Sequence, residues 1–242
     1  PPRSTPLYSS AASDVYKRQI EDGQKKTITK LEPALRKNLV GMRGNGHGMG
    51  IGDINGDGYK DLLLGHGWYE SPGKDCLKTT WKYHKDWQIH GSVPMLVYDV
   101  NNDGKSDILV GEAHAHGLYW WENQGEQNGT IAFEKHLIDE KTSQLHALHL
   151  ADLNADGEPE LITGKRYFAH NGGDKGAREP IEIVYYSIDR KTGTFSRHLI
   201  HQGRAGIGLQ IRAADIDGNG FVDIAVAGKS GTHILFNQGP RE

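Results

Sequence analysis

Short apolar runs alternate along most of the chain with loops rich in aspartate, asparagine and glycine. One such unit occurs four times, and each copy holds an apolar run, a polar loop and a second apolar run, such as residues 62–64 or 108–110. The copies read GDINGDGYKDLLLG from Gly52, YDVNNDGKSDILVG from Tyr98, ADLNADGEPELITG from Ala151 and ADIDGNGFVDIAVAG from Ala214. Two short apolar runs joined by turn-forming residues predict a β-hairpin in every copy.

Further apolar or aromatic segments follow the hairpins and predict a third and a fourth strand. In the second unit they are residues 118–121 and 131–138, and in the third unit 181–186 and 194–200, whereas the fourth unit stops after its third strand, at Phe236. The first aspartates of the loops are 46, 53 and 63 residues apart, periods that suit a blade of four strands. The expected fold is all-β, with four-stranded antiparallel blades in units that start near residues 46, 92, 144 and 206.

Composition agrees with many short elements rather than long apolar helices. The 242 residues include 32 glycines and are 36% hydrophobic, which is typical of a turn-rich chain. A formal net charge of −3 gives no electrostatic case for binding nucleic acid or an anionic membrane. No apolar run approaches the roughly 18 residues that a membrane-spanning helix needs. The single cysteine, Cys76, excludes an internal disulfide framework and a zinc site of several cysteines.

Residues 1–19 share no periodicity with the rest, and we expect them to lie outside the fold. The stretch DVYKRQ, residues 14–19, resembles the translation of a sequencing adapter joined to a truncated reading frame; an ordinary disordered tail is the alternative. Residues 20–45 are expected to be a lead-in segment or a partial strand, and residues 46–242 the bladed region.

The spacing within the four loops predicts a cation site in each. Side chains at loop positions 1, 3, 5 and 9 can converge on one ion, position 7 offers a backbone carbonyl, and a glycine at position 6 permits the tight turn. Every loop supplies three carboxylates and one amide, and such hard oxygen ligands suit calcium. The predicted ligands are Asp53, Asn55, Asp57 and Asp61; Asp99, Asn101, Asp103 and Asp107; Asp152, Asn154, Asp156 and Glu160; and Asp215, Asp217, Asn219 and Asp223.

An alternative for these loops is four polar turns that bind nothing, because Asp, Asn and Gly are also the preferred turn formers. The helical version of such a calcium loop is excluded, because position 12 carries no acid. Leu64, Val110, Thr163 and Val226 stand there instead.

From about Gly46 to Gln238 the repeats resemble those of the FG-GAP and VCBS family, which includes integrin-alpha-like propellers. The resemblance implies a calcium-bearing β-propeller with up to four Ca²⁺ ions here, one for each loop. It does not select an activity, because the family includes adhesion receptors, binding modules and sugar-processing enzymes. Family propellers commonly have about seven blades, so four units favour a fragment of a larger propeller over a closed ring in which residues 27–40 would complete the last blade.

The rim opposite the loops is where chemistry is expected, because the start of strand one and the end of strand two meet there. Histidines, basic residues and aromatic residues gather at these positions. The predicted ligand-binding residues are His66, Trp68, Tyr69, His114, His116, His149, Lys165, His170, Gln210, Arg212 and Lys229. Any one of these histidines alone could equally be a hydrogen-bonded packing residue.

Four further rim residues are candidates for catalysis: His47, His146, Arg166 and Tyr167. Histidine can act as a general base, tyrosine as an acid, and arginine can stabilise an enolate, a set that suits β-elimination or dehydration of a sugar. The third unit resembles blades of the aldos-2-ulose dehydratase propeller, and less closely the ulvan-type lyases. That resemblance implies that a histidine at the position of His146 is catalytic or metal-bound.

Two functions therefore remain open for the chain. The first is a secreted binding or scaffold module for a carbohydrate or protein ligand, located in the periplasm, at the cell surface or outside the cell, where calcium is millimolar. The second is a lyase or dehydratase on the same scaffold. No nucleotide-binding glycine loop, G-x-S-x-G elbow or H-E-x-x-H motif supports another enzyme class.

Overall fold

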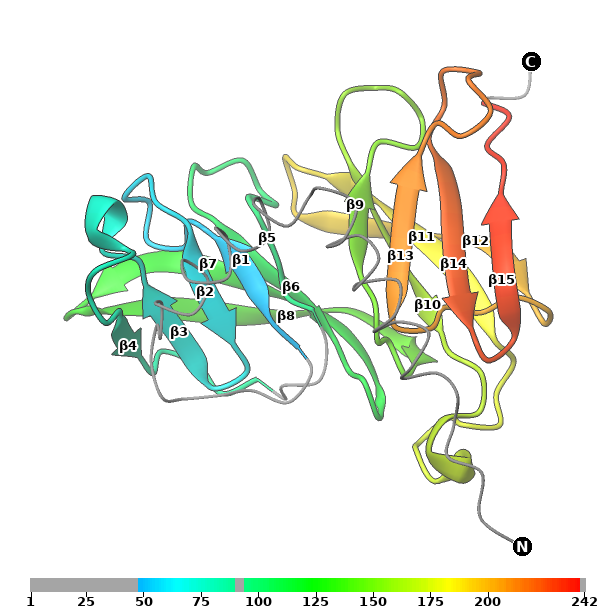
Figure 1. The fold of residues 1–242 in the computed structure, drawn as a ribbon, viewed down its shortest axis with the longest axis horizontal. Helices are drawn as coiled ribbons and strands as arrows, with labels where there is room; N and C mark the ends of the chain where they lie inside the picture. Colours follow the sequence, from blue (N-terminus) through cyan, green and yellow to red (C-terminus); the bar gives the residue numbers. More distant parts are fainter. Residues whose placement is uncertain (1–47, 90–93, 240–242) are drawn as a thin grey trace, which may run out of the picture.

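The computed structural model describes residues 48–89 and 94–239, which form four antiparallel sheets (Figure 1). The first sheet holds β1 (Gly50–Gly52), β2 (Asp61–Leu64), β3 (Gly67–Glu70) and β4 (Lys82–His84). The second holds β5 (Leu96–Tyr98), β6 (Asp107–Gly111), β7 (His116–Gln127) and β8 (Thr130–Ser143). The third holds β9 (His149–Ala151), β10 (Glu160–Lys165), β11 (Glu182–Asp189) and β12 (Thr194–Gln202). The fourth holds β13 (Gln210–Ala214), β14 (Asp223–Gly228) and β15 (Gly231–Leu235).

Each sheet is a meander in which every strand pairs with the next one along the chain. The predicted hairpins are confirmed, since Gly52 lies opposite Asp61 across the first loop and Ala214 lies opposite Asp223 across the fourth. Among the described residues the fourth sheet has three strands, as the sequence predicted. Within the described ranges, the remaining regular elements are the short 3₁₀ turns η2 (Gly73–Asp75) and η3 (Ala169–Gly172), and no helix could cross a membrane.

Neighbouring sheets pack face to face around three hydrophobic clusters, as the blades of a β-propeller do. The first cluster joins sheets one and two through residues such as Leu63, Trp87 and Ile108. The second joins sheets two and three through residues such as Leu109, Leu145 and Val184. The third joins sheets three and four through residues such as Ile162, Ile207 and Val226. Among the described residues no such cluster joins the fourth sheet to the first, which is compatible with the expected larger propeller.

Glycine permits the closest of these approaches, between the inner strands β1 and β5. A Cβ atom placed on Gly52 would lie only 2.4 Å from the Cβ of Val97, and one on Gly50 would lie 2.7 Å from the Met95 carbonyl oxygen. Any larger residue at these positions would therefore push the first two blades apart.

A stacked pair of an aromatic ring and a histidine recurs between the third and fourth strands of the first three sheets. Its members are Trp68 with His84, Trp120 with His136 and Tyr185 with His198, with ring centroids 4.2, 4.6 and 4.6 Å apart. A polar residue two positions after each aromatic holds the histidine: Glu70, Glu122 and Ser187, at 2.6, 2.7 and 3.1 Å. These three histidines are part of the blade architecture.

This packing places two predicted rim residues inside the molecule. The Trp68 side chain is 1% exposed and donates its indole N–H to Asp86 at 3.0 Å, and Tyr69 is 4% exposed. Both lie within the first blade because their strand is covered on both faces, so the expectation that they face a ligand at the rim needs correction.

Candidate functional site

The first residue of each loop organises the backbone that follows it. Asp53 accepts hydrogen bonds at Oδ1 from the Gly56 N–H and at Oδ2 from the Gly58 N–H, both at 2.8 Å. The equivalent bonds run from Gly104 to Asp99 at 3.0 Å, from Gly157 to Asp152 at 2.9 Å and from Gly220 to Asp215 at 3.0 Å. The four loops therefore share one conformation, and the glycine at position 6 takes a φ between +84° and +94° in all of them.

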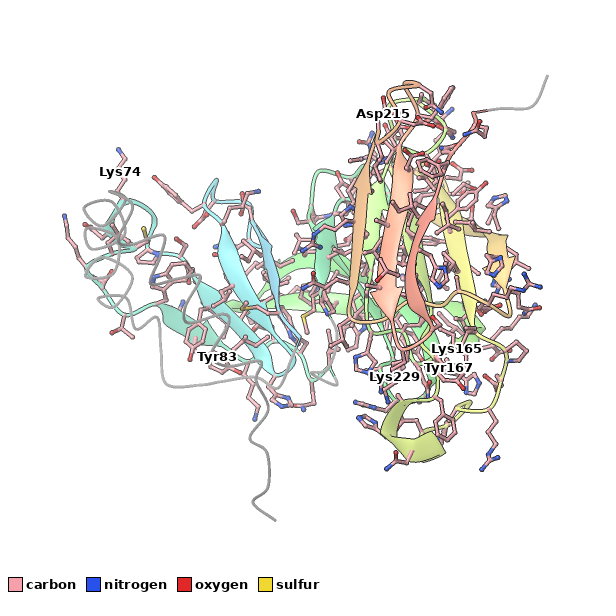
Figure 2. All side chains as sticks on the ribbon, turned by 45° about the vertical axis from the view of Figure 1, so that its right-hand side comes forward. Lys74, Tyr83, Lys165, Tyr167, Asp215 and Lys229 are labelled. Atoms are coloured by element: carbon pink, nitrogen blue, oxygen red, sulfur yellow. The ribbon has the colours of Figure 1, made fainter. Side chains whose placement is uncertain are left out.

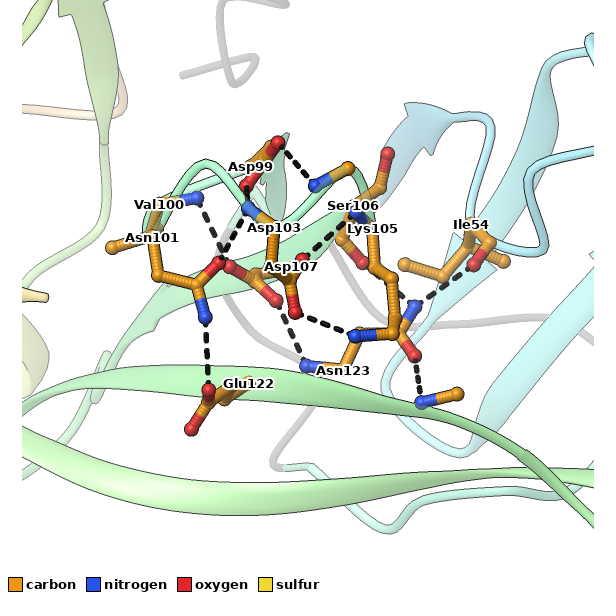
Figure 3. Close-up of polar contacts among 12 residues, drawn as sticks. Ile54, Asp99, Val100, Asn101, Asp103, Lys105, Ser106, Asp107, Glu122 and Asn123 are labelled. Carbon is orange, nitrogen blue, oxygen red and sulfur yellow. Dashed lines mark hydrogen bonds and ion pairs between the residues drawn. The ribbon is translucent and has the colours of Figure 1, made fainter. Parts of the chain in front are cut away.

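The acid at position 9 is buried and ties its loop to the sheet (Figure 3). Asp107 accepts backbone N–H groups from Val100 at 3.0 Å and from Asn123 at 2.8 Å. Asp61 and Asp223 make the same pair of bonds, to Ile54 and Ser71 and to Ile216 and Asn237. Burial raises the pKa of Asp107 to about 6, although these bonds act against the shift. A cation beside it would offset that burial cost.

An asparagine that the sequence reading missed joins neighbouring blades beside the loops. The Asn123 amide donates to the backbone oxygens of Ile54, in the first blade, at 3.1 Å and of Ser106 at 2.9 Å (Figure 3). Asn237 makes the same contacts from the fourth blade, to Leu153 at 2.7 Å and to Val222 at 3.2 Å. The signal was present, because both residues begin an Asn-Gln-Gly triplet, within the third strand of the second blade and just after the third strand of the fourth.

The fourth loop brings together a donor set that fits a hard divalent cation. In the fourth loop, carboxylate oxygens of Asp215, Asp217 and Asp223 lie within 4.8 Å of one another. Oxygen ligands at that separation are what calcium coordination requires.

The predicted rim lies at the opposite end of the sheets. In Figure 2, Lys165, Tyr167 and Lys229 gather at one end of the last two blades, while Asp215 marks the loop end. Lys229 donates from Nζ to the Phe168 backbone oxygen at 3.3 Å, which joins the fourth blade to the connection that follows β10.

Three of the predicted rim residues meet at one carboxylate, Asp174. Its Oδ2 atom lies 3.3 Å from His114 Nδ1, 2.9 Å from His170 Nδ1 and 3.1 Å from an Arg166 guanidinium nitrogen. The His146 ring, 3% exposed, meets the His114 ring edge-on with centroids 5.1 Å apart. Burial alone would raise the pKa of Asp174, but the hydrogen bonds from His170, His114 and Arg166 outweigh it and lower the pKa.

A buried lysine lines a small pocket beside this group. Lys165 is 2% exposed, and its Nζ donates to the Arg166 backbone oxygen at 3.2 Å and to Gln144 Oε1 at 3.5 Å. Burial lowers the pKa of its amine. The pocket has a volume of about 320 Å³ and is lined by Lys141, Lys165, Glu179, Pro180, Glu182, Arg197 and Gln202.

The other predicted rim residues do not join Asp174. His66 pairs with Gln88 at 2.6 Å in the first blade, and His116 pairs with Glu179 at 2.9 Å. Tyr167 is 51% exposed.

Three more predicted rim positions lie on the inner strands of the last two blades. The Arg212 guanidinium donates to Gln210 Oε1 at 3.1 Å. The pKa of His149 is lowered mainly by burial and further by the positive charge of Arg212. The remaining candidate, His47, lies outside the described residues.

The sequence reading also missed the acids that organise this rim. Asp174 and Glu179 lie in the connection between β10 and β11, residues 166–181, which follows the Lys165-Arg166-Tyr167 segment already singled out. The available signal was the length of this connection. At the same place in the other blades the connections are much shorter: residues 65–66, 112–115 and 229–230.

Comparison with known proteins agrees with this architecture. The sequence profile of the FG-GAP-like repeat matches residues 99–163, which run from the second loop to the strand after the third. Integrin alpha-PS3 of Drosophila melanogaster is 24% identical over 172 residues, covering 62% of this chain and 14% of the integrin. Integrin alpha pat-2 of Caenorhabditis briggsae is 29% identical over 224 residues, covering 77% of this chain and 18% of the integrin. Residues 99–163 therefore match the FG-GAP-like repeat, and the four described sheets are arranged as the blades of a β-propeller.

Similarity to other proteins is more distant or more partial. Phosphatidylinositol-glycan-specific phospholipase D of Bos taurus is 25% identical over 175 residues, covering 59% of this chain and 20% of that protein. A solved lectin of Agrocybe aegerita, described as recognising non-reducing terminal N-acetylglucosamine, aligns with a TM-score of 0.49 at 19% identity, covering 78% of this chain and 49% of that one. The chain spans only 14% to 20% of the length of these curated relatives.

Proposed function

We propose that this chain is an FG-GAP-like, calcium-stabilised binding module. The observation that carries the calcium part is the geometry of the fourth loop, in which carboxylate oxygens of Asp215, Asp217 and Asp223 lie within 4.8 Å of one another. Such a cluster repels itself, and a divalent cation at its centre relieves the repulsion.

A calcium-dependent melt tests this part. Each filled loop stabilises the fold by RT ln(1 + [Ca²⁺]/Kd), about 2.7 kcal/mol at a hundredfold excess over Kd. We expect a chelator to lower the melting temperature by several degrees and Ca²⁺ to restore it, with Mg²⁺ a poor substitute because it demands a tighter octahedral shell. The same melting temperature with chelator and with Ca²⁺ would refute calcium stabilisation.

A pair of variants separates the loops from general surface charge. Asp217→Asn removes one carboxylate from the fourth loop with little change in shape and should reduce the calcium-dependent shift. Asp75→Asn makes the same change at an exposed aspartate outside the loops, beside Lys78, and should leave the shift intact. Equal effects of the two variants would contradict loop binding.

We further propose that the rim opposite the loops binds a carbohydrate or protein ligand outside the cell or at its surface. The support is the convergence of His114, His170 and Arg166 with the pocket beside Lys165, since clustered donors and cations suit hydroxyl and carboxylate groups. Loops with three carboxylates suit millimolar external calcium. Retention on immobilised uronate-containing polysaccharide, weakened by Lys165→Met, would support a carbohydrate ligand. Equal retention of Lys165→Met and of Lys74→Met, a change at an exposed lysine of the first blade, would argue against this pocket.

A sugar lyase or dehydratase is the second candidate, favoured by the position of His146 against His114 with Arg166 nearby. Turnover would appear as absorbance of a conjugated product from uronate-containing polysaccharide or a keto-sugar. Loss of that signal in His146→Ala, with an unchanged melt, would support the enzyme. If the wild-type chain is retained on the polysaccharide but forms no product, the result supports a binding module rather than an enzyme.

A further inference from the structure

The rim contains a cluster whose donor atoms differ in kind from those of the loops. His114, His170 and Asp174 each offer one ligand atom, and the three atoms lie within 4.8 Å of one another. We propose that these residues bind a divalent transition metal of the zinc class, at a site separate from the calcium loops.

The separations fit a tetrahedral ion. Two ligand atoms with bonds of about 2.0 Å to one zinc ion lie roughly 3.3 Å apart. Asp174 Oδ2 is 3.3 Å from His114 Nδ1 and 2.9 Å from His170 Nδ1. The two imidazole rings now stack with centroids 4.8 Å apart, and the His170 side chain, 55% exposed, has room to turn its nitrogen onto an ion shared with His114.

The ligand types select the metal. Imidazole nitrogens suit zinc and its neighbours, whereas calcium takes oxygen ligands almost exclusively. Two histidines and one carboxylate also leave the fourth tetrahedral position open, as in zinc sites that bind a water or a substrate oxygen.

Two other clusters of this kind occur in the described residues, and the fold explains both. Asp215, Asp217 and Asp223 belong to the fourth loop. Glu122 and His136, grouped with Glu134, belong to the aromatic-histidine pairs that recur in three blades. Within residues 48–89 and 94–239 the cluster at Asp174 has no counterpart in the other blades, so blade architecture does not account for it.

The segment that supplies two of the ligands is held in an unfavourable backbone conformation. Phe168, His170 and Asn171 all take left-handed φ values, +33°, +47° and +54°, without being glycine. Such strain persists only where surrounding contacts enforce it, and it concentrates at functional sites. Here it brings His170 and Asp174 back over His114, which lies in a different blade.

Arg166 has a consistent place in this arrangement. Its guanidinium donates to Asp174 at 3.1 Å, and a partner of that kind fixes the orientation of a ligating carboxylate. Its positive charge beside the ion predicts a weaker site than one built without it.

The test is calorimetric titration of ZnCl₂ into the full chain with the loops saturated by Ca²⁺. We expect one zinc site per chain, and a loss of affinity of at least about 10- to 100-fold in both His170→Ala and Asp174→Asn, since even outer-shell changes cost that much. Absence of a zinc site in the wild-type chain would overturn the proposal.

Two controls make the result specific. Glu134→Gln alters the exposed acid of the Glu122–Glu134–His136 cluster and should still bind zinc. If Glu134→Gln loses zinc binding while Asp174→Asn retains it, the zinc site lies elsewhere and the assignment is refuted. The calcium-dependent melt of Asp174→Asn should match that of the wild type. If the wild-type chain shows no zinc binding but keeps its calcium-dependent shift in melting temperature, the rim metal site is rejected and the calcium proposal is unaffected.

Discussion

Asn123 is the side chain whose loss should most directly uncouple the first two blades. It is 4% exposed, and its amide donates to the backbone oxygens of Ile54 at 3.1 Å and Ser106 at 2.9 Å. Its own oxygen accepts the Gly125 N–H at 2.9 Å. Asn123→Ala therefore removes three hydrogen bonds at once, one of which crosses between blades.

The cost can be worked from these contacts. A hydrogen bond contributes about 1 kcal/mol net, and a buried group left without a partner costs about 1–3 kcal/mol. Three lost bonds, with Ile54 only 1% exposed, give a loss of about 3 kcal/mol in the free energy of unfolding. For a domain of this size that corresponds to a fall of roughly 6–12 °C in melting temperature.

Urea and thermal unfolding, followed by circular dichroism with Ca²⁺ present, would measure the loss. Gln124→Ala is the matched control. The Gln124 side chain is next to Asn123 in the sequence but is exposed, so its removal should change the free energy of unfolding by less than about 0.5 kcal/mol. Asn123→Asp keeps the size but turns an oxygen toward the two carbonyl oxygens, so it should cost at least as much as alanine. A loss in Asn123→Ala no larger than that in Gln124→Ala would refute the reasoning.

Two further predictions concern a loop glycine and a buried carboxylate. Gly104→Ala should cost about 1–2 kcal/mol through its φ of +84° alone, because an added Cβ would meet no atom within 4 Å; chemical unfolding would measure it, with an unaffected melt contradicting a conformational cost. Burial would raise the pKa of Asp139, but hydrogen bonding from Tyr186 and other contacts outweighs it and lowers the pKa. The ionised Asp139 carboxylate should therefore stabilise the fold fully above about pH 4, and this contribution should fade as the pH falls further. Asp139→Asn should flatten this part of a curve of unfolding free energy against pH. An equal slope in the wild type and the variant would contradict the prediction.

The hairpins and their loops could be predicted because their determinants are local. The aspartate at position 1 binds backbone groups at most five residues away, as Asp53 does with Gly58, and the flanking apolar runs fix the strand pairing on either side. The three-stranded fourth sheet followed from the same pattern, because no apolar segment stands after Phe236.

The roles of individual histidines and tryptophans were not predictable in this way. Trp68 and His84 lie on different strands, and their stacking depends on the register between β3 and β4. From the sequence, Trp68 beside His66 looked like a rim aromatic. The packing of a second blade against the first decided that it is core instead.

The sequence by itself determined the repeated unit, the strand order within each sheet and the acidic loop of every blade. Tertiary structure alone decided which polar side chains meet: His114 and Asp174 stand 60 residues apart, and they touch because the long connection after β10 folds back over the neighbouring blade. Asn123 reaches Ile54 across 69 residues for a related reason, since the first two blades pack face to face. Periodicity and turn chemistry act over a few residues and are written in the sequence order, whereas contacts between blades depend on how the finished sheets pack.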